Sequence, residues 1–180
     1  MTTFWREGYE SASVSDLVEA TGVGRASLYN AFEDKHGLFE ACLRRYAEDR
    51  IPARTGLLTD GERGLDDIRA FLRPLSEVSP EAAPSGCLMM NASVERGVSD
   101  PFVRDMAAEY RADLTNAFRA ALDRALDLGE IVGPIDGHAE ILALSSMGLS
   151  AARSAGAGAA EIDSLIASFE QLLDSWAKPA

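Results

Sequence analysis

Four polar side chains of different chemistry lie within six consecutive residues, from Arg25 to Asn30. Arg25 carries a fork-shaped cation and Asn30 an amide, and both groups can pair with the edges of bases. Ser27 and Tyr29 carry hydroxyl groups, which commonly contact phosphate oxygens. This combination is typical of a protein surface that binds DNA.

A helix-turn-helix would place these side chains together on one face. Ser13 and Asp16 have capping-box spacing, which predicts a short helix that begins there and ends at Gly22. A second helix is expected after Gly24. One apolar stripe of this second element should be buried, formed by Val23, Leu28 and Phe32. The polar residues then occupy its free face.

The same stretch resembles the TetR family of bacterial transcriptional regulators. The resemblance covers about residues 4 to 46, and its most specific elements are Gly8-Tyr9, Thr21-Gly22-Val23, Leu28-Tyr29 followed by Phe32, and Asp34-Lys35. In that family the helix before Gly8 normally runs a dozen or more residues. Only Met1 to Glu7 precede Gly8 here, so we expect a shortened first helix.

The resemblance implies roles for single residues. Tyr29 and Lys35 resemble phosphate contacts, and the positions near base edges are Arg25, Ala26, Ser27 and Asn30. Ser13 and Ser15 begin the first motif helix, where they could offer hydroxyl and backbone N–H groups to a phosphate, although capping alone also explains them. The alternative for the whole set is an ordinary solvated helix face.

The net charge alone would argue against DNA binding. The 180-residue chain carries a formal charge of -12, and residues 1 to 50 contain six Lys or Arg against nine Asp or Glu. Bulk charge mainly governs nonspecific attraction, whereas specific binding by a dimer needs only a few well-placed cations in each half-site. We therefore expect weak nonspecific binding.

The apolar periodicity predicts an all-α chain. We expect a three-helix helix-turn-helix head at residues 1–47 and a larger helical body at 48–180. A linking helix should follow Asp34 and end at Pro52, with a loop or broken turn over 52–64. Further helices are expected at about 65–78 with a kink at Pro74, then 87–95, 101–128 with Asp100 as its cap, 136–154 and 160–176.

The last two predicted helices are candidates for a homodimer interface. The final helix has a sharp apolar stripe, and the helix before it is apolar nearly all round with many small residues. A second copy could cover both in a four-helix interface, which the family resemblance also implies. A two-fold dimer would place its recognition helices about 34 Å apart on a palindromic operator. The alternative is that both helices complete a monomer core.

The resemblance also implies a cavity in the body for a small-molecule effector. The residues that we expect to line it are Phe71, Leu75, Cys87, Met89, Met90, Phe102, Met106, Tyr110, Phe118 and Met147. A filled core is the alternative, because periodicity does not distinguish a lined cavity from a packed interior.

Cys87 lies in a Gly86-Cys87-Leu88 segment similar to one in TetR-family regulators that include electrophile and redox sensors. A thiol in the first turn of a helix has a lowered pKa and higher reactivity. The alternative is an inert, buried cysteine, which we expect for Cys42 because it lies within an apolar helix stripe.

No pattern indicates an enzyme, a cofactor or a metal site. His36 and His138 belong to no paired catalytic or ligand motif, and the two cysteines form no disulfide framework. The longest mostly uncharged run, residues 141–152, is too short to span a bilayer of about 30 Å. We therefore predict a cytoplasmic, dimeric repressor released from its operator by a small molecule or by thiol modification. The rival is an all-α dimeric interaction protein that has lost DNA binding.

Overall fold

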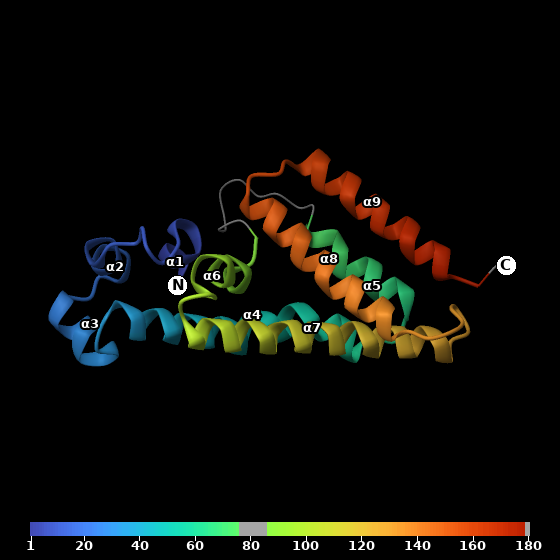
Figure 1. Ribbon diagram of the computed structural model, residues 1–180, viewed down its shortest axis with the longest axis horizontal. Coiled ribbons are helices and arrows are strands. Elements are labelled where there is room, and N and C mark those ends of the chain that lie inside the picture. The colour runs from blue at the N-terminus through green and yellow to red at the C-terminus, as the bar shows by residue number, and fades with distance from the viewer. Residues whose placement is uncertain (76–85, 179–180) are drawn as a thin grey trace.

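The computed structural model describes residues 1–75 and 86–178 of the chain. Within these residues the secondary structure is helical, apart from an isolated antiparallel bridge between Ile131 and Ala177. Figure 1 shows an elongated molecule with α1 to α3 gathered at one end and α4 and α7 running along its length. The predicted all-α fold is confirmed.

Three short helices form the head: α1 (Thr2–Glu7), α2 (Val14–Thr21) and α3 (Arg25–Phe32). The predicted capping box is present, because the Ser13 hydroxyl accepts from the Asp16 amide at 3.2 Å and the Asp16 carboxylate accepts from the Ser13 amide at 2.8 Å. Gly22 ends α2 in the left-handed conformation with φ 67°, which costs glycine little. The helix-turn-helix is therefore formed by local signals.

Aromatic side chains attach the short α1 to the rest of the molecule. Phe4 is fully buried and meets Phe39 edge-on, with 5.1 Å between ring centroids. Trp5 meets Tyr46 edge-on at 5.2 Å. Burying one such ring stabilises a fold by on the order of 2 to 3 kcal/mol. A single turn and a half of helix is thereby held against α4.

The helix that differs most from the prediction is α4 (Lys35–Asp60), which continues through Pro52 instead of ending there. Proline removes one helix hydrogen bond and crowds the carbonyl four residues earlier. The helix persists because both of its halves are packed, with Tyr46 buried before the proline and Leu58 buried after it. The predicted loop at 52–64 is therefore wrong over residues 52–60. The predicted head–body boundary at 47/48 falls inside α4 and stays a prediction.

The body contains α5 (Leu65–Leu72), α6 (Leu88–Arg96), α7 (Pro101–Asp127), α8 (Asp136–Ser154) and α9 (Ala159–Trp176). Pro74 does not kink a continuing helix, because α5 ends at Leu72 and a 3-10 turn, η1 (Arg73–Leu75), follows. The rest of that predicted helix, residues 76–78, lies outside the described residues. The other body helices agree with prediction.

The hydrophobic core of the body lies along α7. Its Leu114, Phe118 and Leu122 are almost completely buried, and α7 packs against α4, α5, α6 and α8. Near the far end of α7, the Arg124 guanidinium donates to the Leu58 and Thr59 carbonyls and so caps the C-terminus of α4. In the described parts of the chain, no helix combines the length and the apolar character needed to span a bilayer.

Candidate nucleic-acid interface and effector groove

The outer face of α3 carries the predicted recognition residues. Arg25, Ala26, Ser27 and Asn30 are exposed, and Tyr29 is half-buried. The Arg25 guanidinium donates to the Tyr29 hydroxyl at 3.2 Å and lies 5.4 Å from the centre of its ring. The N-cap of α3 is Gly24, which has no side chain to occupy the first-turn amides. Such amides favour an anion.

The apolar stripe of this motif is narrower than expected. Leu28 is buried and Phe32 is half-buried, but Val23 is 42% exposed. Val23 lies in the turn between α2 and α3, where the chain leaves the small head core. The prediction that Val23 is buried is therefore wrong.

The remaining predicted DNA contacts flank α3. Ser13 and Ser15 are exposed at the start of α2, and the Ser13 hydroxyl is occupied in the capping box. The Lys35 ammonium donates to the Glu10 carbonyl at 3.3 Å and stands 4.6 Å from the centre of the Tyr9 ring. All eight predicted residues thus belong to α2 with its N-cap, to α3 and to the first turn of α4, at one end of the molecule (Figure 1).

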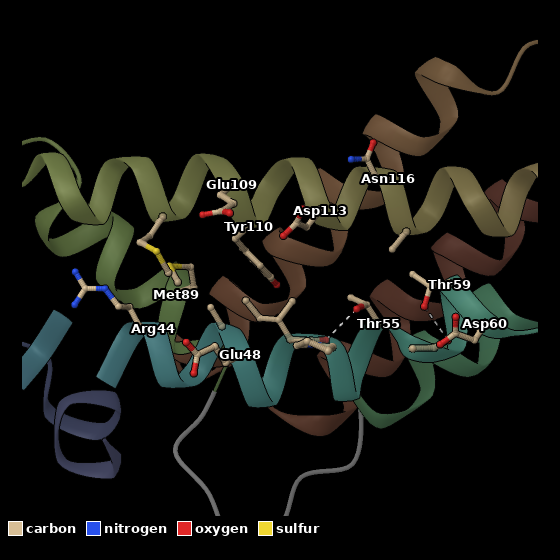
Figure 2. Close-up of a pocket in the computed structure, with 16 residues that line it drawn as sticks. Arg44, Glu48, Thr55, Thr59, Asp60, Met89, Glu109, Tyr110, Asp113 and Asn116 are labelled. Carbon is tan, nitrogen blue, oxygen red and sulfur yellow. Dashed lines mark hydrogen bonds between the residues drawn. The ribbon is translucent and has the colours of Figure 1, made fainter. Parts of the chain in front are cut away.

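A groove of about 750 Å³ lies between α4 and α7, a volume within the usual range of small-molecule sites. Figure 2 shows Tyr110 extending from α7 toward α4 across this groove, with Met89 of α6 at one side. The lining residues are Arg44, Ala47, Glu48, Ile51, Pro52, Thr55, Gly56, Thr59, Asp60, Met89, Met106, Glu109, Tyr110, Asp113, Asn116 and Ala117. Three of them, Met89, Met106 and Tyr110, were expected to line a cavity.

The other predicted cavity residues do not line this groove. Phe71 and Phe118 are buried and meet edge-on at 5.2 Å. Met90 and Phe102 are only half-buried, and three more lie in the packed core: Leu75, Cys87 and Met147. A ligand role for these side chains stays a prediction.

The polar lining of the groove was missed by sequence reasoning. On α4 it recurs at helical spacing, at Arg44, Glu48, Thr55 and Thr59. This periodicity was readable, but a helix assumed to end at Pro52 divides the stripe in two. The sequence signal was therefore hidden by the incorrect helix boundary.

Cys87 is the N-cap of α6 and only 1% exposed. The Tyr46 hydroxyl of α4 donates to its Sγ at 3.3 Å. Burial, reinforced by the neighbouring Cys87 thiol, raises the pKa of both Tyr46 and Tyr110. Both phenols therefore stay neutral, and a reagent must first open this contact to reach the sulfur. Cys42 is buried as expected.

A polar contact joins the head to the α6–α7 corner of the body. The Glu95 carboxylate accepts from the backbone amides of Tyr9 and Glu10, both at 2.8 Å. Arg96 pairs with Glu10 at 2.6 Å and lies 4.6 Å from the centre of the Tyr9 ring. Because Met89 of the same helix borders the groove, α6 contacts both the groove and the head.

A second polar contact lies beside it. His36 Nε2 lies 2.8 Å from Asp100 Oδ2, at the N-terminus of α7. Burial acts to raise the pKa of Asp100, but hydrogen bonds from His36 and from the Val103 and Phe102 amides outweigh it and hold that pKa below its usual range. The carboxylate thus serves both as helix cap and as partner of the head.

Known proteins match both parts of the chain. Residues 1–42 match the family described as bacterial regulatory proteins, tetR family, and residues 64–169 match the tetracyclin repressor-like C-terminal domain. The transcriptional repressor ComR of Escherichia coli is 37% identical over 93 residues, which cover 51% of this chain and 44% of ComR. The repressor AcnR of Corynebacterium glutamicum is 31% identical over 128 residues, which cover 71% of this chain and 62% of AcnR.

Solved structures share the whole fold. A cysteine mutant of the TetR family regulator CifR, in complex with operator DNA, is 28% identical with a TM-score of 0.81 and covers 97% of this chain and 92% of its own. A TetR regulator from Chloroflexus aurantiacus, 21% identical, has a TM-score of 0.84 and covers 99% and 92%. The helix-turn-helix head, the helical body and these matches agree: the chain belongs to the TetR family of bacterial regulatory proteins.

Proposed function

We propose that the protein is a transcriptional repressor that binds a palindromic DNA operator as a homodimer and leaves it when a small molecule occupies the α4–α7 groove. The observation that carries this proposal is the continuity of α4. It begins directly after α3, whose polar face is exposed, and it forms one wall of the groove. CifR, at 28% identity, is bound to operator DNA in its structure.

The proposed dimer contact uses α8 and α9. Ile141 and Leu144 on α8 and Leu165 on α9 are 45%, 58% and 39% exposed. Burying apolar surface of this kind contributes roughly 25 cal/mol for each Å² removed from water. A second copy with the same face would cover these side chains and set the spacing of two α3 helices for one operator.

Release follows from differential binding. A two-fold dimer binds its operator only when both heads match the groove spacing of DNA. An effector that favours another spacing lowers operator affinity by its preference for that state, and operator DNA lowers effector affinity equally.

Modification of Cys87 is the second candidate trigger. Its support is the contact with Tyr46, because a group added to the sulfur must displace a side chain of α4. The burial of Cys87 favours the small molecule as the primary signal, since a buried thiol is poorly accessible to reagents.

The rival function, an interaction protein without DNA binding, rests on the short α1. The aromatic contacts of Phe4 and Trp5 with α4 weigh against it, because they hold α1 in place beside the helix-turn-helix.

Fluorescence anisotropy on duplexes from the DNA flanking the coding region tests the proposal. We expect sequence-specific binding of two chains to a palindrome, lost in the Arg25→Ala/Asn30→Ala variant. Equal affinity for flanking and scrambled duplexes would favour the rival.

A further inference from the structure

The rim of the α4–α7 groove is strongly acidic. Glu48 and Asp60 come from α4, and Glu109 and Asp113 come from α7 (Figure 2). Arg44 is the lining residue of opposite charge. The whole chain has 29 acidic to 17 basic residues, so four carboxylates against one guanidinium exceed the general acidity of the protein.

These carboxylates lack cationic partners. Throughout residues 1–75 and 86–178, none of the four takes part in an ion pair. Arg44 does not neutralise them, because it pairs with Glu40 at 2.9 Å and stands 4.5 Å from the centre of the Phe102 ring. The groove therefore presents uncompensated negative charge.

A buried polar side chain points into the same groove. Tyr110 is only 6% exposed, and its hydroxyl end lies in the groove between α7 and α4 (Figure 2). Its polar neighbours are the Cys87 thiol, with which it forms a weak hydrogen bond, and the Arg54 guanidinium. Within the described residues, no nitrogen or oxygen atom forms a hydrogen bond with this hydroxyl. A buried hydroxyl so placed has hydrogen-bonding capacity left for a ligand.

The walls below the rim are apolar, formed by Ile51, Pro52 and Met106. A metal ion does not fit, because nowhere in the described residues do three His, Cys, Asp or Glu side chains come together closely enough to hold one. An anion would be repelled by the rim. The lining thus matches a molecule with an apolar body and a delocalised or shielded positive charge, which the aromatic ring and carboxylates attract together.

We propose that the effector is a lipophilic organic cation, bound with its apolar body against Ile51 and Met106 and its charge among Glu48, Glu109 and Asp113. This inference rests on the proposed function, because it names the chemical class that the release site accepts.

Three matched probes test the chemical class on the full-length protein by titration calorimetry. They are a naphthylbutyl-trimethylammonium ion, its uncharged tert-butyl isostere and the corresponding naphthyl carboxylate. We expect the cation to bind at least about 10-fold tighter than either of the others, with affinity that falls as salt is added. Equal binding of the isostere, tighter binding of the carboxylate or binding of none of the three overturns the assignment.

Single substitutions in the groove test where the positive charge of the bound probe lies. Glu48→Gln and Asp113→Asn each remove one rim charge from an exposed site. Each should lower the affinity for the cation by about 2- to 5-fold and leave the affinity for the isostere unchanged. Asp123→Asn, which removes an exposed charge from the same helix outside the groove, is the matched control. Equal losses in the control and the rim variants would overturn the placement.

Operator release is measured separately by anisotropy. If the cation binds the groove but leaves operator affinity unchanged, the chemical class stands and the proposed release function fails. If the isostere or the carboxylate releases the operator while the cation does not, release stands and the cationic class fails.

Discussion

The Glu95 carboxylate holds the backbone amide of Tyr9 at 2.8 Å across 86 positions of the sequence. One side chain of α6 thereby fixes the loop that joins α1 to α2. The same helix borders the α4–α7 groove with Met89. Contacts of this kind make the orientation of the head dependent on the position of a body helix.

Removing that carboxylate should loosen the head. Glu95→Ala leaves the Tyr9 and Glu10 amides without their protein acceptor, and we expect a loss of about 1 kcal/mol in the free energy of unfolding because the bonds are exposed to water. Operator affinity should fall as well. Urea unfolding and anisotropy measure both, with the exposed Glu62→Ala as control. If the variant has the same free energy of unfolding and the same operator affinity as the unmutated protein, this contact does not orient the head.

Recognition and phosphate binding should separate in two variants of the head. Arg25→Ala should cost about 1 to 3 kcal/mol on the preferred operator and relax discrimination at one base position. Lys35→Ala should weaken all sequences alike and flatten the dependence of affinity on salt. Titrations of a set of single-base operator variants at several salt concentrations distinguish the two effects. The roles are wrong if the two variants behave identically.

The exposed apolar residues of α8 and α9 predict the dimer contact. Leu144→Glu combined with Leu165→Glu should yield folded monomer, since both side chains face solvent in the single chain and a buried charge would oppose association. Val98→Glu, at a 98% exposed position of the α6–α7 turn, is the control. Analytical ultracentrifugation reads the outcome, and an unchanged dimer in the double variant would place the interface elsewhere.

The depressed pKa of Asp100 predicts a pH dependence with a defined sign. A carboxyl whose pKa is lower in the folded state stabilises the protein above its unfolded pKa, and this contribution is lost as the pH falls through the folded pKa. We therefore expect stability to decline below about pH 4. Asp100→Asn should be less stable at neutral pH and less sensitive to acid, as measured by urea unfolding across that range. Parallel pH profiles for the two proteins would contradict this account.

Pro52 should limit the stability of α4. Pro52→Ala restores the missing backbone N–H and relieves crowding with the Glu48 carbonyl, so the free energy of unfolding should rise by about 1 to 3 kcal/mol. Pro101→Ala is the matched control, because a proline at the first helical position removes no helix hydrogen bond. Circular dichroism in urea gives both values. A destabilised Pro52→Ala protein would mean that α4 needs its proline for packing.

The sequence predicted correctly those parts of the fold that are set by local signals. The capping pair Ser13 and Asp16 and the Asp100-Pro101 start act through neighbouring residues, so their helices form where expected. Pro52 gave the wrong boundary because Tyr46 and Leu58, on the same helix before and after it, are buried against other helices, and this packing outweighs a local preference. Tertiary contacts of this kind cannot be read from a single helix pattern.

Of the two candidate sites, the face of α3 could be predicted from local periodicity and the lining of the groove could not. The exposed face of α3 follows from helical periodicity, which places Arg25 and Asn30 away from the buried Leu28. In the body, periodicity identifies an apolar face but not which apolar residues meet empty space. Phe118 therefore lies in the core, whereas Tyr110, eight residues earlier on the same helix, reaches the groove.

The cap that Arg124 places on the end of α4 has a mechanical consequence. Arg124 anchors the last carbonyls of α4 to α7 near Asp60, and a swing of α4 about this fulcrum must break the His36–Asp100 contact that ties its first turn to the N-terminus of α7. At 1.5 Å per residue, Pro52 lies about 12 Å from that fulcrum and Lys35 about 38 Å from it. A rigid swing that shifts the helix by 1 Å beside the groove therefore moves its other end by about 3 Å. Because α4 is followed back along the chain by α3, any such displacement beside the groove would be larger at the exposed face of α3.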